Sequence, residues 1–309
     1  MPSTTISSRP YAVRDDLRQM ESIVSAAWAG PGRPFVHCTI GDLEWWLASG
    51  GPDAAWADRI RIWSIGGAIA GWGWIAPPAS LDWFVRDGLP DDQEQAVRRE
   101  ILAWHAETAT AAHPPPDGPL PDLWAADGWP ESAALPGLGW TATEVVLTQY
   151  LQALDIDLDP PRVPDGYVLR SLRGPADIPA RVEVHRAAFA PSRMTVEKYA
   201  ILTDQDHYGF DRDIVLEAAD GTFAAFAMCW IDPTGSIGEF EPVGVHPDHQ
   251  RRGLGRVIMR HGLRLMRSAG LRDALVFSLR TNVASEALYR SAGFREVALH
   301  RRYTKAVGG

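Results

Sequence analysis

The sequence predicts an α/β fold built as two tandem domains. Three observations support this: the chain length, an ordered alternation of helix and strand patterns, and an internal repeat. The chain has 309 residues, whereas compact domains commonly hold about 100–200 residues. Hydrophobic residues make up 46% and charged residues 22% of the chain, as is typical of globular proteins. Each half is therefore long enough to bury a core.

The second half alternates between residue patterns typical of β-strands and patterns typical of α-helices. Strand patterns occupy residues 167–172, 213–218, 222–230, 237–245 and 274–278, helix patterns occupy 175–190, 254–269 and 283–291, and a final pair of strands is expected after residue 291. A helix that crosses between the central strands indicates an α/β sandwich.

The first half repeats this plan. The segment PDDQEQAVRREIL, starting at Pro90, aligns without gaps with PDHQRRGLGRVIM, starting at Pro247. Residues 132–145 match 285–297 with one residue missing, and a Gly66-Gly67 hairpin matches one at Asp220-Gly221. Three matches in the same order indicate a tandem duplication. We therefore expect domains at 1–155 and 166–309, joined by the proline-rich acidic linker 156–165.

The charge is divided unevenly between the halves. Residues 1–155 hold 9 Arg against 20 Asp and Glu, whereas residues 156–309 hold 21 Arg and Lys against 19 Asp and Glu. An acidic first half argues against a nucleic-acid partner there. No apolar stretch is long enough for a membrane span, the N-terminus lacks a signal-peptide pattern, and only two cysteines occur. We expect a cytoplasmic protein without a membrane partner.

The strongest functional signal is VGVHPDHQRRGLGR, residues 243–256, where a strand pattern leads into a glycine-containing turn and then a helix. Backbone N–H groups at such a turn and at the helix N-terminus point outward, and glycine lets a phosphate approach closely. Arg251, Arg252 and Arg256 add positive charge. The segment therefore predicts a phosphate-binding loop.

The same loop resembles a known family. Residues 250–255, QRRGLG, match the Q/R-x-x-G-x-G/A acyl-CoA motif of the GNAT superfamily of N-acetyltransferases, and TNVASEALYRSAGF at 281–294 resembles its second motif. The resemblance covers nearly all of residues 166–309. It implies two tandem GNAT-like domains, each a mixed, mostly antiparallel central sheet flanked by helices, and acetyl-CoA as co-substrate.

The resemblance also implies roles for individual residues. The pantetheine arm would pair with the backbone of Val243, Gly244 and Val245, and Asn282 and Ser285 would line its other side. The pyrophosphate would lie on the loop formed by Gln250, Arg251, Arg252, Gly253, Leu254, Gly255 and Arg256. Tyr289 matches the family tyrosine that protonates the departing thiolate or positions the thioester. The alternative is a phenol that only packs against the turn at Phe294.

Direct transfer requires a neutral amine, although an alkylamine has a pKa of about 10.4, so a base must take its proton. Glu239 and Glu241 lie two residues apart on one strand and hence on one face. We prefer Glu241, which precedes Pro242, although either glutamate could instead be a solvated or salt-bridged strand residue. Acyl transfer through Cys229 is a further alternative, but a strand cysteine is usually a small buried hydrophobe. No metal-ligand spacing occurs, so no metal is expected.

The first copy lacks these features. Glu94, Gln95, Ala96 and Arg98 align with Arg251, Arg252, Gly253 and Gly255, and Pro136 stands at the position of Tyr289. We expect the first copy to be degenerate, to support the second copy and to form a wall of its acceptor site. The predicted function is N-acetylation of a primary amine of a small molecule. The alternatives are a non-catalytic acyl-CoA-binding or interaction module and a protein N-acetyltransferase. The sequence indicates neither the acceptor nor the oligomeric state.

Overall fold

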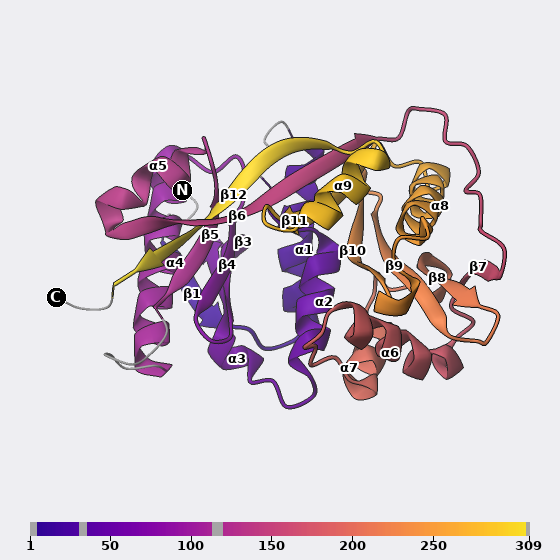
Figure 1. Ribbon diagram of the computed structural model, residues 1–309. Helices are drawn as coiled ribbons and strands as arrows, with labels where there is room; N and C mark the ends of the chain where they lie inside the picture. Colours follow the sequence, from indigo (N-terminus) through magenta and orange to yellow (C-terminus); the bar gives the residue numbers. More distant parts are fainter. Residues whose placement is uncertain (1–4, 31–35, 113–119, 307–309) are drawn as a thin grey trace.

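The computed structural model describes residues 5–30, 36–112 and 120–306, which form one mixed sheet of twelve strands flanked by helices (Figure 1). The strand order is β1-β2-β3-β4-β5-β12-β6-β11-β10-β9-β8-β7. The predicted α/β class with a mostly antiparallel sheet is confirmed. In these ranges no helix is both long and apolar enough to cross a bilayer.

The strands are β1 (Ile6–Pro10), β2 (Ile60–Ile65), β3 (Ala68–Ala76), β4 (Ser80–Val85), β5 (Asp122–Ala126), β6 (Trp140–Ala153), β7 (Tyr167–Ser171), β8 (Asp213–Ala218), β9 (Phe223–Asp232), β10 (Ile237–Val245), β11 (Asp273–Leu279) and β12 (Arg295–Lys305). The helices are α1 (Arg14–Ala29), α2 (Ile40–Gly50), α3 (Trp56–Arg59), α4 (Asp91–Ala112), α5 (Pro130–Ala134), α6 (Ile178–Ala188), α7 (Val196–Thr203), α8 (Leu254–Ser268) and α9 (Val283–Ser291).

The last strand of each half lies beside the other half's strands. β6 pairs antiparallel with β11, from Asp273↔Ala153 to Leu279↔Leu147. β12 pairs with both β5 and β6, and the two long strands run side by side across the molecule (Figure 1). The prediction of a final pair of strands after residue 291 is wrong. β12 is a single strand that pairs with the long strand β6 through two register shifts.

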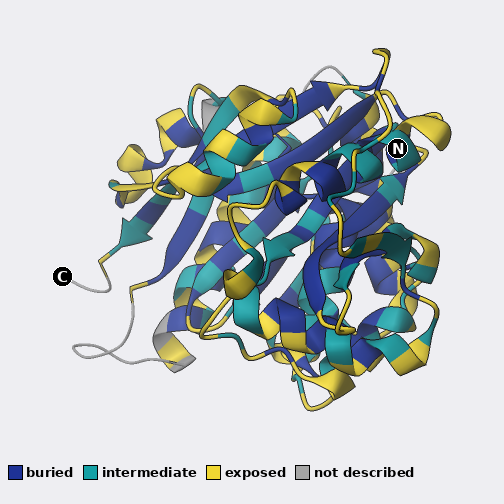
Figure 2. Cartoon of the chain, turned by 45° about the vertical axis from the view of Figure 1, so that its right-hand side comes forward, coloured by how far each residue is buried: buried dark blue, intermediate teal, exposed yellow. Residues whose placement is uncertain are grey.

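Helices from both halves cover the strands of the second half. On one face α8 lies close to β10, since a Cβ on Gly262 would fall 2.2 Å from the Phe240 ring. On the opposite face Ile237 and Leu275 pack in one cluster with Trp28 of α1. Figure 2 shows the resulting band of buried strands through the middle of the molecule. The first half therefore forms part of the surroundings of β10, where Glu239 and Glu241 lie.

The segment aligned with the phosphate loop is helical in the first half. α4 begins at Asp91, which aligns with Asp248, whereas α8 begins only at Leu254. Glu94, Gln95, Ala96 and Arg98 therefore lie within a helix, whereas the residues aligned with the first three precede α8. Ala96 and Arg98 are better helix formers than the glycines they replace, and acidic residues in the first turn favour a helix N-terminus.

A buried ion pair fixes α6 to β8. Arg181 Nε donates to Asp213 Oδ1 at 2.8 Å, and both side chains are fully buried. Asp213 also accepts hydrogen bonds from the hydroxyls of Tyr199 and Tyr208. These contacts hold α6 and α7 beside the sheet.

Replacing Arg181 by Leu should lower the free energy of unfolding by about 3–5 kcal/mol, because it leaves a buried carboxylate without its cation. Urea denaturation measures the change. The double variant Arg181→Leu/Asp213→Asn should recover part of the loss. A loss below about 1 kcal/mol in the single variant would show that this pair does not stabilise the fold in this way.

Candidate active site

The central strands β10 and β11 separate halfway along their length. Their parallel ladder covers Ile237↔Asp273 to Glu239↔Leu275 and includes no pair beyond Glu239. On its other edge β10 stays paired with β9, with Val243↔Ala227, Gly244↔Phe226 and Val245↔Ala225. A register shift separates Phe240 from Val243 on this ladder. The backbone at Val243, Gly244 and Val245 is therefore outside the ladder on the side facing β11, where an extended ligand could pair with it.

The predicted phosphate loop follows β10 directly. Arg251 and Gly253 have left-handed backbone conformations, with φ of +59° and +77°. Such residues turn successive N–H groups toward one side and form a concave anion site. A Cβ on Gly253 would meet no atom within 4 Å, so this glycine is required for its conformation. Gln250, Arg251, Arg252 and Gly253 are exposed, and Leu254 begins α8 as a buried residue.

Gly255 lies at a close contact between two helices. Its φ is not positive, and a Cβ there would lie 3.1 Å from Leu288 of α9. Glycine at this position therefore allows α8 and α9 to approach each other. At the start of α9, the side chain of Asn282 accepts a hydrogen bond from Ser285 N at 3.1 Å and caps the helix.

A basic cavity of about 720 Å³ adjoins the phosphate loop. Its wall includes Arg162 from the segment between β6 and β7, together with Arg252, Arg256 and Arg260. The Arg252 side chain donates to Tyr167 Oη at 3.0 Å and to the Asp248 carbonyl at 3.3 Å. Four guanidinium groups, against the one carboxylate of Asp159 that lies 3.8 Å from Arg260, make this cavity suited to a polyanionic ligand.

Glu241 lies at a second cavity, of about 340 Å³. The lining residues come from α2, α6, α7, β10 and the segment between α6 and α7, and they are Trp45, Ser49, His185, Phe189, Pro191, Ser192, Arg193, Met194, Lys198, Glu241 and Pro242. Trp230 Nε1 donates to the Glu241 carbonyl at 2.7 Å. Burial raises the pKa of Glu241 to about 7, so near neutral pH this carboxyl can both take up and release a proton.

Glu239 points into a closed acidic cluster instead of this cavity. It is buried, and its carboxylate accepts a hydrogen bond from the Thr39 hydroxyl at the start of α2. Burial, followed by the charge of Asp42, raises the pKa of Glu239 well above its usual range. Burial and the charge of Glu241 raise the pKa of Asp42 to about 8. Three carboxyl groups from both halves thus influence one another.

Tyr289 is buried on α9 between aromatic neighbours. Its ring meets Tyr150 of β6 edge-on at 5.7 Å and lies 6.2 Å from Phe294. Burial, with a further contribution from the charge of Glu241, raises the pKa of Tyr289 above its ordinary value. The phenol therefore stays protonated at neutral pH. The charge of Glu241 contributes to the raised pKa of Tyr289. The Tyr289 ring also packs against Phe294, as in the alternative role considered for it.

Several residues at these sites were not predicted from the sequence. Thr39, Asp42 and Tyr150 come from the first half, and only tertiary packing brings them to β10 and α9. No local motif marks them. Cys229 is buried and the pKa of its thiol is raised by burial, which disfavours the thiolate that a covalent route requires.

Comparison with known proteins identifies the family. Residues 181–294 match the acetyltransferase (GNAT) family. A mycothiol acetyltransferase of Tsukamurella paurometabola is 30% identical over 246 residues, which cover 75% of this chain and 81% of that protein. The mycothiol acetyltransferase of Thermobispora bispora is 28% identical over 281 residues, covering 87% and 89%.

A solved structure shows the same fold over the whole length. It is a tandem GNAT protein from the clavulanic acid biosynthesis pathway, with a TM-score of 0.66 and 16% identity, and the match covers 99% of both chains. Acetyl-CoA is the co-substrate that this fold implies. The chain therefore belongs to the GNAT family and is an acetyltransferase.

Proposed function

We propose that the protein transfers an acetyl group from acetyl-CoA to a primary amine of a small molecule by direct attack. The observation that supports this most is the position of Glu241. It lines a cavity beside the point where β10 and β11 separate, and its pKa of about 7 suits a base. An acceptor in that cavity would meet a thioester held along β10.

The C-terminal residues are suited to hold acetyl-CoA. Its pyrophosphate would bind to the loop from Gln250 to Arg256, with the left-handed residues Arg251 and Gly253 turning N–H groups toward it. The basic cavity lined by Arg162 and Arg260 would hold the nucleotide end. The pantetheine arm would pair with the open edge of Val243 to Val245, and Asn282 and Ser285 would lie opposite.

In the reaction Glu241 takes a proton from the ammonium form of the acceptor, directly or through water. The free amine then attacks the thioester carbonyl, a C–N bond forms and the C–S bond breaks. Tyr289 gives its proton to the departing sulfur, and the nitrogen gives its second proton to water as the amide forms. Exchange with solvent restores Tyr289 and Glu241. The products are an acetamide and CoA.

The acceptor cavity favours a small molecule over a protein substrate. Its volume of about 340 Å³ falls within the range of about 300–1,000 Å³ common for small-molecule pockets. Trp45 of the first half and Lys198 of α7 form part of its wall. The similar proteins are mycothiol acetyltransferases, so we propose a mycothiol-related amine as the first acceptor to test.

The function is tested by measuring thiol release from acetyl-CoA with a panel of small amines and with peptides bearing a free N-terminus. We expect release that depends on a small amine and a matching acetamide detected by mass spectrometry. CoA binding without amine-dependent release would support a non-catalytic module. Faster release with peptides than with every small amine would support a protein acetyltransferase.

Replacing Gly253 by Val should weaken CoA binding by about 5- to 30-fold, because a left-handed conformation costs a residue with a Cβ about 1–2 kcal/mol. Titration calorimetry measures the affinity. Gly221→Val is the matched control, since Gly221 has a similar φ of +88° and open space but lies in the β8–β9 turn. Equal affinities in both variants would contradict the assignment of the loop.

A further inference from the structure

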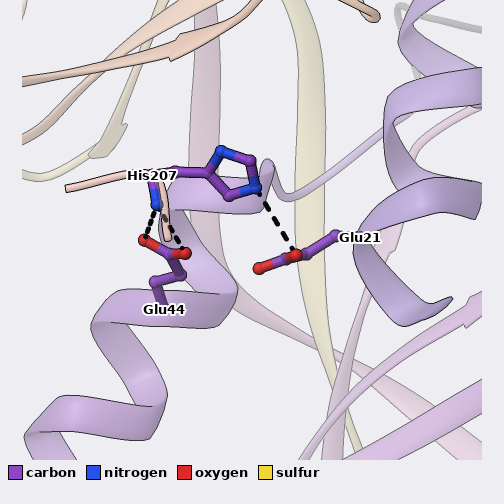
Figure 3. A group of neighbouring side chains, drawn as sticks. All are labelled: Glu21, Glu44 and His207. Carbon is purple, nitrogen blue, oxygen red and sulfur yellow. Dashed lines mark hydrogen bonds and ion pairs between the residues drawn. The ribbon is translucent and has the colours of Figure 1, made fainter. Parts of the chain in front are cut away.

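Three side chains with metal-binding groups meet where α1, α2 and the turn after α7 come together. They are Glu21 of α1, Glu44 of α2 and His207. One ligand atom from each lies within 4.8 Å of the other two. Figure 3 shows the Glu21 carboxylate beside the imidazole of His207 and the Glu44 carboxylate beside the His207 backbone nitrogen. The cluster is separate from Glu241 and from the phosphate loop.

The two carboxylates are buried and lack a full set of partners. Glu21 is 5% exposed and Glu44 is 0% exposed. Within the described residues, Glu21 Oε1 has no hydrogen-bond partner, and in Figure 3 the Glu21 carboxylate is turned toward Glu44. Both oxygens of Glu44 accept from the same donor, the backbone N–H of His207, at 2.9 and 3.1 Å. A carboxylate offers about four acceptor positions, so the cluster has unused acceptors.

The positive charges nearby are paired with other acidic groups. Arg14 lies 2.6 Å from Asp206, and Arg18 lies 2.8 Å from Asp206 and from Asp15. His207 Nε2 lies 3.5 Å from Glu21 Oε2, and this contact raises the pKa of His207. Burial raises the pKa of Glu44 to about 7. Two buried carboxylates are therefore balanced by at most one imidazolium charge.

The geometry fits a metal ion better than an ion pair. A separation of 3.5 Å exceeds the usual N–H···O distance of about 2.7–3.2 Å. Ligand atoms placed about 2.0–2.2 Å from a tetrahedral Zn²⁺ lie about 3.3–3.6 Å from one another. A Glu44 oxygen lies within 4.8 Å of the other two ligand atoms, and it would have to move toward them to complete three ligands at this spacing. His207 is 36% exposed on its side chain, so a water molecule can reach the fourth position.

We propose that Glu21, Glu44 and His207 bind a divalent cation of the zinc class. One imidazole nitrogen with two carboxylates suits Zn²⁺, whereas sites for Mg²⁺ are usually built from oxygen alone. The ion would join the first half of the chain to the turn that follows α7. Since α2 carries Trp45 and α7 carries Lys198, it would fix two walls of the cavity at Glu241.

The proposal does not depend on acetyl transfer, because its test measures metal binding. Chelator-treated protein is titrated with ZnCl₂ by calorimetry, and Co²⁺ is added separately to record the absorption of a tetrahedral site. We expect one Zn²⁺ per chain. Glu21→Gln, Glu44→Gln and His207→Gln should each weaken Zn²⁺ binding at least tenfold. Glu107→Gln, an exposed charge on α4, should leave the affinity unchanged.

Thermal melting of the metal-free variants checks that they fold. If a glutamate variant does not fold, His207→Gln is the decisive variant, because His207 is partly exposed. Absence of Zn²⁺ binding to the wild-type chain would overturn the proposal. So would undiminished binding in His207→Gln, or a preference for Mg²⁺ over Zn²⁺.

Discussion

Glu241→Gln should lower kcat for amine acetylation by about 10²- to 10⁴-fold, the range that a positioned general base contributes. The amide keeps the shape of the side chain but cannot accept the proton of the acceptor. The affinity for CoA should stay within about threefold of the wild-type value, because Glu241 lies at the acceptor cavity rather than at the phosphate loop. Steady-state kinetics and calorimetry separate the two effects.

Amine acetylation should depend on pH through the ionisation of Glu241. Burial raises the pKa of Glu241 to about 7, and only the ionised carboxylate can take a proton. At saturating acceptor, kcat should therefore rise with pH, with a midpoint near 7, and fall off toward acid. The variant Glu241→Gln should lose this acid limb, the fall of kcat toward low pH.

Glu239→Gln is the comparison that assigns the base. Glu239 is buried against Thr39 and does not line the cavity, so its replacement should have a smaller effect on kcat and keep the acid limb. The opposite ranking of the two variants would transfer the role of the base to Glu239.

Tyr289→Phe should lower kcat by about 10²-fold, at the lower end of the range for acid–base groups, with little change in the KM for acetyl-CoA. The phenol is held protonated by burial and by the charge of Glu241, and it is the proposed donor to the leaving sulfur. Removing its hydroxyl leaves the ring packing intact. With acetyl thioesters of more acidic thiols, Tyr289→Phe should lose less of its kcat, because a better leaving group needs less protonation.

Tyr150→Phe is the matched control for this variant. Tyr150 is also buried and its ring contacts Tyr289 edge-on, yet no proton transfer is assigned to it. We expect kcat within about threefold of the wild-type value. If the two variants lost the same activity, Tyr289 would act through packing alone, as its contact with Phe294 also permits.

The elements of the second half could be predicted because their signals are local. Alternation marks β7 and β10, the Asp220-Gly221 turn marks the β8–β9 hairpin, and the glycine turn marks the start of α8. No motif marks the segment 190–213, and α7 lies within it. Its amphipathic stretch is only eight residues long, which is too short for periodicity to stand out.

The arrangement of the two halves could not be predicted in the same way. Whether β6 pairs with β11 or with a strand of its own half depends on long-range register, and the repeat alone allows both. The acidic cluster of Thr39, Asp42 and Glu239 and the cluster of Glu21, Glu44 and His207 have members far apart in the chain. Such sites leave no spacing in the sequence, which is why no metal was expected from it.

A crystal structure with acetyl-CoA bound tests the account most directly. We expect the pyrophosphate on the backbone N–H groups around Arg251 and Gly253, the pantetheine arm along Val243 to Val245, and the thioester between Tyr289 and the cavity at Glu241. Acetyl-CoA bound elsewhere, with its thioester remote from both Glu241 and Tyr289, would contradict it.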